Sequence, residues 1–274
     1  MSARDSTARG VGSASDQPQR SGRHDAGSGA GNKLYIHELI DIVGHNRAKY
    51  QHHMTANWVP VALEERNQRC YGVWSTIGST GAWPQVVNMW ELDGWDGLVR
   101  NFEVETAGGR DQDPSLAEWW AVAASLRRGG FDRILVPDEH SRSIEQLCDD
   151  GVRGELYCHE IVRVPPGRAN DLLTLVRATG EDAYEAEGLE LVGAFRTAMR
   201  ADDECVLLWA CPSWAVWGEF EQAWHGGDLA GWSKALLDLG ASWHRTVLVD
   251  SALSPMRIGR QPAASDRRPL DEVR

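Results

Sequence analysis

Several features that would assign this chain to a particular class are scarce in its 274 residues. The longest apolar run, residues 205–217, is interrupted by Pro212 and is shorter than the roughly 20 residues that cross a bilayer. Residues 1–33 contain no apolar segment of the kind that a secretion signal requires. We therefore expect no membrane-spanning helix and no signal peptide, and we expect a cytoplasmic location.

Cysteine and positive charge are also in short supply. The five cysteines are odd in number and form no CxxC pair, which favours reduced, buried thiols over a disulfide framework. No HExxH motif or paired Cys and His spacing predicts a metal site. The 28 Lys and Arg residues are outnumbered by 40 Asp and Glu, so the formal net charge is −12. Charge of this sign opposes nucleic acid or an anionic membrane as a partner.

Tryptophan, by contrast, is abundant, with 13 residues in the chain. A tryptophan needs a large apolar environment and a partner for its indole N–H group, so this enrichment suits aromatic-lined pockets, large interfaces or cores. Both ends of the chain lack such residues. Residues 1–32 contain no aromatic residue and are rich in Gly and Ser, which predicts a disordered tail. Residues 257–274 are polar and predict a flexible C-terminal tail.

Between the tails the sequence repeats itself. YIHE at residues 35–38 returns as YCHE at residues 157–160. LAEWWAVAASLRRGGFDRILVP, residues 116–137, aligns without gaps with LAGWSKALLDLGASWHRTVLVD, residues 229–250. The alternation of strand and helix periodicities has the same order in both regions. We therefore predict an internal duplication, with one unit over residues 33–150 and a second over residues 151–256.

Each unit has the predicted order βαββαβ. This order is typical of the ferredoxin-like arrangement, a four-stranded antiparallel sheet with helices on one face. The other face of each sheet would be bare, and two units in one chain can bury their bare faces against each other. The sequence thus predicts an α+β fold in which two tandem ferredoxin-like units form an intrachain α+β barrel.

A family resemblance rests on YIHE, YCHE, GVWSTIGSTGAWPQVVNMWE and RTVLVDSALSP. With these segments, residues 33–256 resemble NIPSNAP-type members of the dimeric α+β barrel superfamily, as two tandem units. The resemblance implies a small-molecule site, because the superfamily includes haem-dependent aldoxime dehydratases, chlorite dismutases, cofactor-free monooxygenases and polyketide cyclases. It transfers no particular chemistry to this chain. A homodimer of the duplicated chain is also consistent with the resemblance.

Strand alternation predicts which side chains point into the barrel. His37 is the candidate general acid or base, because histidine titrates near neutrality without special tuning. Tyr35 and Asn88 would orient a substrate or donate to a developing oxyanion. Glu38 and Glu160 are assigned to the helix-facing side, as structural ions. The residues predicted to line a ligand pocket inside the barrel are Trp74, Thr76, Trp90, Tyr157, His159, Phe195 and Trp209.

Three functions follow from this arrangement. The first is a cofactor-free enzyme that acts on a hydrophobic or aromatic molecule by acid/base chemistry of the lyase, cyclase or isomerase kind. The second is haem binding, with His37 or His159 as the axial ligand. The third is a noncatalytic ligand carrier or interaction module, in which the aromatic residues and histidines fill a packed interior.

Overall fold

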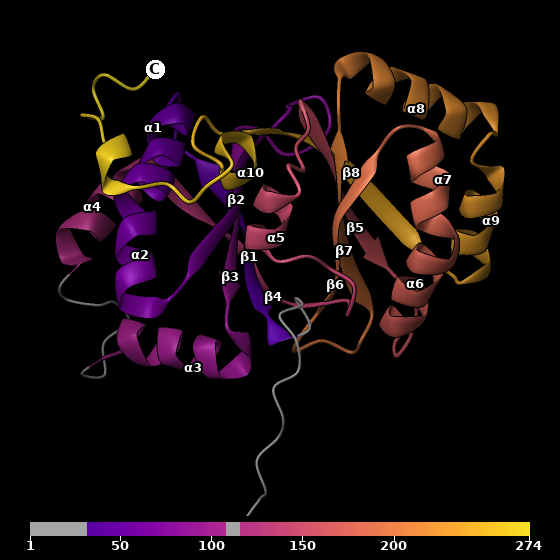
Figure 1. Cartoon of the computed structure of the whole chain (residues 1–274), viewed down its shortest axis with the longest axis horizontal. Helices are drawn as coiled ribbons and strands as arrows, with labels where there is room; N and C mark the ends of the chain where they lie inside the picture. Colours follow the sequence, from indigo (N-terminus) through magenta and orange to yellow (C-terminus); the bar gives the residue numbers. More distant parts are fainter. Residues whose placement is uncertain (1–31, 108–115) are drawn as a thin grey trace, which may run out of the picture.

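The computed structural model describes residues 32–107 and 116–274, and these form a mixed α+β fold around a closed β-barrel (Figure 1). Eight strands of the described chain follow one another around the barrel in the order β1-β3-β2-β8-β5-β7-β6-β4. All of their pairings are antiparallel. The described residues contain no helix that is both long and apolar enough to cross a membrane.

The first half of the described chain contributes four strands and the helices that cover them. A nearly continuous helix, π-helical at its centre, separates the first two strands. Two further helices separate the third strand from the fourth. The elements are β1 (Leu34–Ile42), α1 (Arg47–His52), η2 (His53–Trp58), α2 (Val59–Arg66), β2 (Arg69–Thr76), β3 (Gln85–Leu92), α3 (Gly94–Glu105), α4 (Ala117–Leu126) and β4 (Arg127–Pro137).

The second half has the same order of strands and helices, including a π-helical turn in its first long helix. Short helix α5 (Ile144–Asp149) connects the halves, and α10 (Pro255–Ile258) follows the last strand. The elements are β5 (Leu156–Arg163), α6 (Ala169–Leu175), η4 (Val176–Gly180), α7 (Glu181–Ala186), β6 (Glu190–Thr197), β7 (Glu204–Cys211), α8 (Trp214–Gly226), α9 (Ala230–Asp238) and β8 (Ser242–Asp250).

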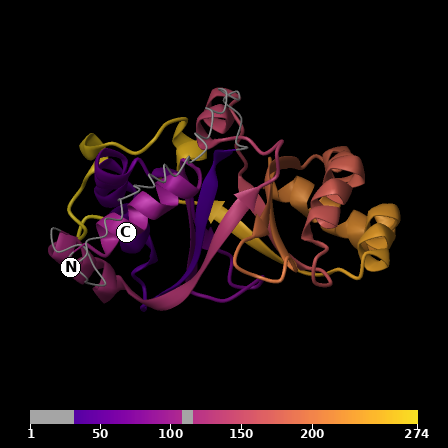
Figure 2. The same cartoon turned by 90° about the horizontal axis from the view of Figure 1, so that it is seen from below.

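Strand pairing within the two halves is the same. In the first half β1 lies between β3 and β4, and β2 pairs with β3. In the second half β5 lies between β7 and β8, and β6 pairs with β7. The halves meet at two short seams, β2 with β8 and β4 with β6, of three residue pairs each. The helices of each half cover the outer face of its own strands, so the helical layers lie on opposite sides of the barrel (Figure 2).

The barrel interior is a packed cluster to which all eight strands contribute. Tyr35 makes edge contacts with the rings of Tyr71 and Phe195, with 5.0 Å between ring centroids in each pair. Ile144 of α5 and Met256 of α10 belong to the same buried cluster. These two short helices therefore close one end of the barrel over the aromatic rings.

The C-terminal segment, which the sequence predicted to be flexible, runs along the helices of the first half (Figure 1). The Gln261 side chain bonds both the backbone N–H and the carbonyl group of Cys70, at 2.9 and 2.8 Å. The Arg267 side chain donates to the carbonyl of Ala56, which lies in the π-helical turn η2. Residues 1–31, predicted to form a tail, lie outside the described residues.

Candidate functional site

The structure divides the ten residues that the sequence predicted for a site inside the barrel. Seven lie on strand faces that point into the barrel, where their rings and side chains pack against one another. The other three point outward, under the helices. The seven are Tyr35, His37, Trp74, Thr76, Tyr157, His159 and Phe195, and the three are Asn88, Trp90 and Trp209.

His37 and His159 meet at the centre of the barrel. Their Nε2 atoms are 2.9 Å apart, and the rings are stacked with 5.0 Å between centroids. Burial lowers the pKa of both histidines, that of His159 to about 3, and the nearby Arg133 lowers both further. Two neutral rings that share one hydrogen bond suit a packed interior.

The predicted inward orientation of Asn88 and Trp90 is wrong because of the strand register. Glu38 lies directly opposite Asn88 in the β1–β3 ladder, and residues opposite each other share a face. Asn88 and Trp90 therefore face the helices with Glu38, while Val87 and Met89 face the interior. The predicted inward orientation of Trp209 is wrong for the same reason. A register error of one residue reverses the orientation of every side chain in a strand, and Trp209 packs with the helix-facing cluster of the second half.

On the helix-facing side of the first half, these residues surround Glu38. The indole Nε1 of Trp90 and the amide Nδ2 of Asn88 donate to the same oxygen of Glu38, Oε2, at 2.9 and 2.8 Å. Asn88 Nδ2 also donates to the hydroxyl of Tyr50 at 3.0 Å. Among the described residues no donor bonds the second oxygen, Oε1. One carboxyl oxygen is thus fixed and the other is left for a ligand.

A second carboxylate lies beside Glu38. Asp132 of β4 is directly opposite Glu38 in the β1–β4 ladder, on the side away from Asn88. Burial, and then the charge of Asp132, raise the pKa of Glu38 to about 7, although the bonds from Trp90 and Asn88 and the charge of Arg127 act in the other direction. Glu38 can therefore both release and accept a proton near neutral pH.

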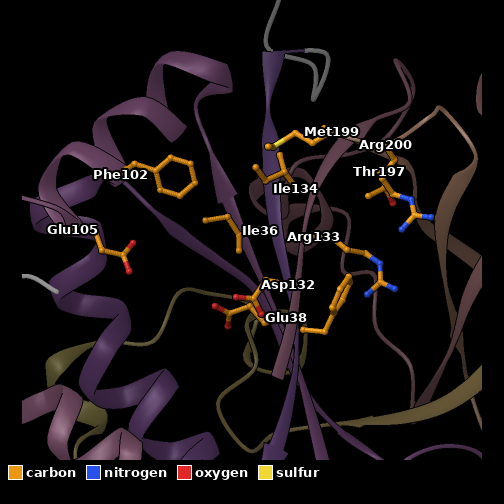
Figure 3. Close-up of a pocket in the computed structure, with 12 residues that line it drawn as sticks. Ile36, Glu38, Phe102, Glu105, Asp132, Arg133, Ile134, Thr197, Met199 and Arg200 are labelled. Carbon is orange, nitrogen blue, oxygen red and sulfur yellow. The ribbon is translucent and has the colours of Figure 1, made fainter. Parts of the chain in front are cut away.

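A pocket of about 550 Å³ opens beside this carboxyl group (Figure 3). Ile36, Phe102 and Ile134 supply apolar surface, and Glu105 of α3 adds a third carboxylate. Burial raises the pKa of Glu105 as well, and the charge of Asp132 raises it further. The rest of the described lining comes from β4 and from the end of β6 and the turn after it: Phe131, Asp132, Arg133, Thr197, Ala198, Met199 and Arg200.

The second half carries the equivalent carboxylate, Glu160, in a closed setting. Arg245 of β8 is directly opposite Glu160, at the position where the first half has Asp132. Arg245 Nε and the Tyr184 hydroxyl both donate to Glu160 Oε1 at 2.8 Å, and Trp209 Nε1 donates to Oε2 at 3.2 Å. The predicted role of a structural ion therefore fits the contacts of Glu160, whereas no arginine or lysine of the described chain forms such a pair with Glu38.

The donor set of the first-half pocket does not fit an axially ligated haem. Its described lining contains no histidine, cysteine or tyrosine, and the one methionine, Met199, is 86% exposed, whereas haem iron is commonly ligated by these four side chains inside a pocket. His37 and His159, the predicted axial ligands, bond each other inside the barrel instead. Within residues 32–107 and 116–274, no group of three or more His, Cys, Asp or Glu side chains is arranged to hold a metal ion.

The sequence predicts the helix-facing orientation of Glu38 correctly but does not identify it as a candidate functional residue. A sequence feature that sets it apart from Glu160 is present in the ungapped alignment of residues 116–137 with residues 229–250, which aligns Asp132 with Arg245. A reversal of charge opposite an otherwise repeated glutamate distinguishes the two halves. The contributions of Glu105 and of the turn at residues 198–200 have no comparable sequence signal.

Comparison with known proteins bears on the fold. No protein-family profile matches the sequence, and no curated protein matches it. An anthrone oxidase-like protein of known structure is 13% identical, with a TM-score of 0.53 over 81% of this chain and 94% of that chain. This likeness shows a shared fold and nothing about the reaction.

Two other solved structures have lower TM-scores. A dye-decolorizing protein from V. cholerae is 9% identical, with a TM-score of 0.47 over 82% of this chain and 95% of its own. A NIPSNAP-like domain protein from Burkholderia xenovorans is 17% identical, with a TM-score of 0.33 over 41% of this chain and 91% of its own. Likenesses this distant say nothing about function.

Proposed function

We propose that this protein is an enzyme that acts on a small, partly apolar organic molecule by acid/base chemistry without a cofactor, with Glu38 as the proton-transferring group. The observation that carries the proposal is a shielded carboxyl group with a pKa of about 7 beside a pocket of about 550 Å³. Perturbed carboxyl groups in pockets of this size are typical of catalytic sites.

The surroundings of Glu38 support a division of roles. Trp90 and Asn88 fix Oε2, so that a proton can be exchanged at Oε1. The substrate's apolar body would lie between Ile36 and Phe102. Arg133 also lines the pocket, but its side chain is on the opposite face of β4 from Glu38, where its Nε donates to Glu204 Oε1 at 3.0 Å.

We also infer that the two halves descend from one ferredoxin-like unit by tandem duplication. The matching strand pairings and the repeated YIHE and YCHE segments support this origin. In this view the second half has kept the glutamate and its indole partner but has gained Arg245, which holds Glu160 as a structural ion. The histidines and rings inside the barrel are then structural.

A titration tests the observation on which the proposal depends. Carbon-13 NMR of the protein with labelled glutamate carboxyl groups, compared with the Glu38→Gln variant, assigns the signal of Glu38. We expect this signal to titrate near pH 7, because burial and Asp132 disfavour the charged form. A midpoint near that of an exposed glutamate, about 4.3, would remove the basis of the proposal.

An exchange reaction tests the chemistry. Acetophenone in D₂O incorporates deuterium into its methyl group when a base removes a proton next to the carbonyl. We expect the protein to accelerate this exchange and Glu38→Gln to reduce the acceleration by about 100-fold or more. The control is His37→Gln, in the barrel interior, which should retain the acceleration if the variant is folded. Equal loss in the two folded variants would contradict the assignment to Glu38.

A further inference from the structure

A second, smaller pocket adjoins the first on the helix side of Glu38. Its volume is about 70 Å³, and it shares Ile36, Glu38 and Glu105 with the main pocket. We call it the tryptophan pocket, because the remaining described lining includes four indole rings. The rings are those of Trp58, Trp90, Trp119 and Trp120, and Gln68 lies among them in the lining.

Three buried polar atoms of residues that line this pocket have no hydrogen-bond partner among the described residues. They are Oε1 of Gln68 and the indole Nε1 atoms of Trp119 and Trp120. Gln68 is only 4% exposed. A buried polar group without a partner is destabilising, so three of them around one small space indicate that the space takes a hydrogen-bonding ligand.

The volume of the pocket and the charges of its lining residues indicate which class of ligand it takes. The volume of about 70 Å³ exceeds the roughly 10–15 Å³ that one water needs and is well below the roughly 300 Å³ of the smallest typical ligand pockets, so the tryptophan pocket suits water and not a substrate. The unpartnered atoms include both donors and an acceptor, and the charged lining residues include both signs, Arg66 and Arg127 with Glu38 and Glu105. Neither an anion nor a cation is favoured, whereas water uses donors and acceptors together.

The second half fills the corresponding region with side chains. The counterpart of Trp119 in the ungapped alignment is Trp232. Its ring lies so close to Gly180 that a Cβ atom at that position would be 3.0 Å from it. The ring of Tyr184 stacks on that of Trp209 with 4.1 Å between centroids. In the second half the rings of Tyr184, Trp209 and Trp232 therefore pack together near Glu160, although Nε1 of Trp232 also has no hydrogen-bond partner among the described residues.

We propose that the tryptophan pocket holds a water molecule that Glu38 activates, and that the enzyme adds this water to an electrophilic carbon of the molecule in the main pocket. This inference rests on the proposed function of Glu38. The Glu38 carboxylate takes a proton from the water while the water oxygen bonds to the carbon of a C=O, C=N or conjugated C=C group. The π electron pair moves to the far atom, which then receives the proton from Glu38. The sum is one added water, so the substrate class is an electrophilic carbonyl-type compound.

Crystallography of the full chain tests the water site directly. We expect ordered water within about 3.2 Å of Gln68 Oε1 and of at least one of the two indole nitrogens. The Trp119→Phe/Trp120→Phe double variant keeps aromatic rings but removes the N–H donors, so the water should be lost or displaced. Trp232→Phe, at the counterpart of Trp119, is the matched control and should retain it. A pocket without ordered water in the unaltered protein would overturn the proposal.

A second isotope separates this proposal from the proposed function. Acetophenone in H₂¹⁸O gains ¹⁸O by reversible addition of water to its carbonyl group, and mass spectrometry measures the rate. We expect Glu38→Gln and the double tryptophan variant each to reduce this exchange at least 10-fold, with Trp232→Phe unchanged. Glu38-dependent deuterium exchange without Glu38-dependent ¹⁸O exchange would overturn the water proposal alone. If Glu38 affects neither isotope, the proposed function fails and the water proposal fails with it.

Discussion

The two halves of the barrel place the same glutamate in two different electrostatic environments. Glu38 and Glu160 occupy equivalent positions on β1 and β5, and each accepts a hydrogen bond from a tryptophan indole, Trp90 or Trp209. The residue opposite the glutamate differs. Glu38 lies opposite Asp132, whereas Glu160 lies opposite Arg245.

This difference in charge changes what the carboxyl group can do. Arg245 is a permanent charge whose guanidinium also bonds Glu221 and lies 4.6 Å from the ring centroids of Phe220 and Trp224, so Glu160 belongs to a closed network. Asp132 instead opposes ionisation of Glu38, whose pKa is about 7. The scaffold supplies a shielded carboxyl group in both halves, and the neighbouring charge decides whether it forms an ion pair or titrates.

The largest expected effect is the loss of stability when Arg245 of the second half is replaced. Arg245→Met leaves Glu160 buried without its counter-ion, and breaking a buried pair in this way costs about 3–5 kcal/mol. Asp132→Asn in the first half removes a repulsion, so it should change stability by less than about 1 kcal/mol. Urea unfolding at pH 7 measures both free energies.

A double variant checks the cause of that loss. Glu160→Gln/Arg245→Met removes both charges, so it should recover a large part of the stability lost in Arg245→Met. If the double variant is no more stable than Arg245→Met, the packing of the guanidinium on Phe220 and Trp224 dominates, and the electrostatic comparison is wrong.

An effect of intermediate size is expected from Glu38 of the first half, on the pH dependence of stability. The pKa of Glu38 is raised from 4.5 to about 7 by folding, so its contribution to stability is present below pH 4.5 and is lost as the pH rises through 7. Between pH 5 and 8 the protein should lose about 2–3 kcal/mol relative to Glu38→Gln, which cannot titrate at this position. Urea unfolding of both proteins across this range gives the difference. Parallel curves would show that Glu38 is ionised throughout.

Much of the architecture could be predicted from the sequence, because apolar periodicity and the internal alignment both report on it. The α+β class and the strand and helix order follow from these patterns, and the structure closes the strands into one barrel. The faces of β3 and β7 could not be predicted in this way. Every residue of β7 is buried, as are all but the first of β3, so neither strand shows the alternation of polar and apolar residues that assigns a face.

The same limit explains why the sequence does not point to Glu38. With Asn88 and Trp90 assigned to the interior, His37 is the candidate acid or base and Glu38 is a structural ion. The ladder register brings Asn88, Trp90 and Glu38 together on the other face. Pairing partners are set by contacts between distant segments, and for a strand buried on both faces no local pattern reveals them.

The smallest expected effect comes from the indole donors that the two halves share. Trp90→Phe removes a hydrogen bond to the charged form of Glu38, so the acid dissociation constant of Glu38 should fall about three- to tenfold and its pKa should rise. Trp209→Phe removes the equivalent bond to Glu160, which keeps its bonds from Arg245 and Tyr184. That variant should lose about 1 kcal/mol of stability and should leave the pKa of Glu38 unchanged. Since both substitutions delete a similar ring volume, carbon-13 titration of Glu38 in the two variants isolates the effect of the indole donor. An equal shift in both variants would mean that the bond from Trp90 does not lower the pKa of Glu38.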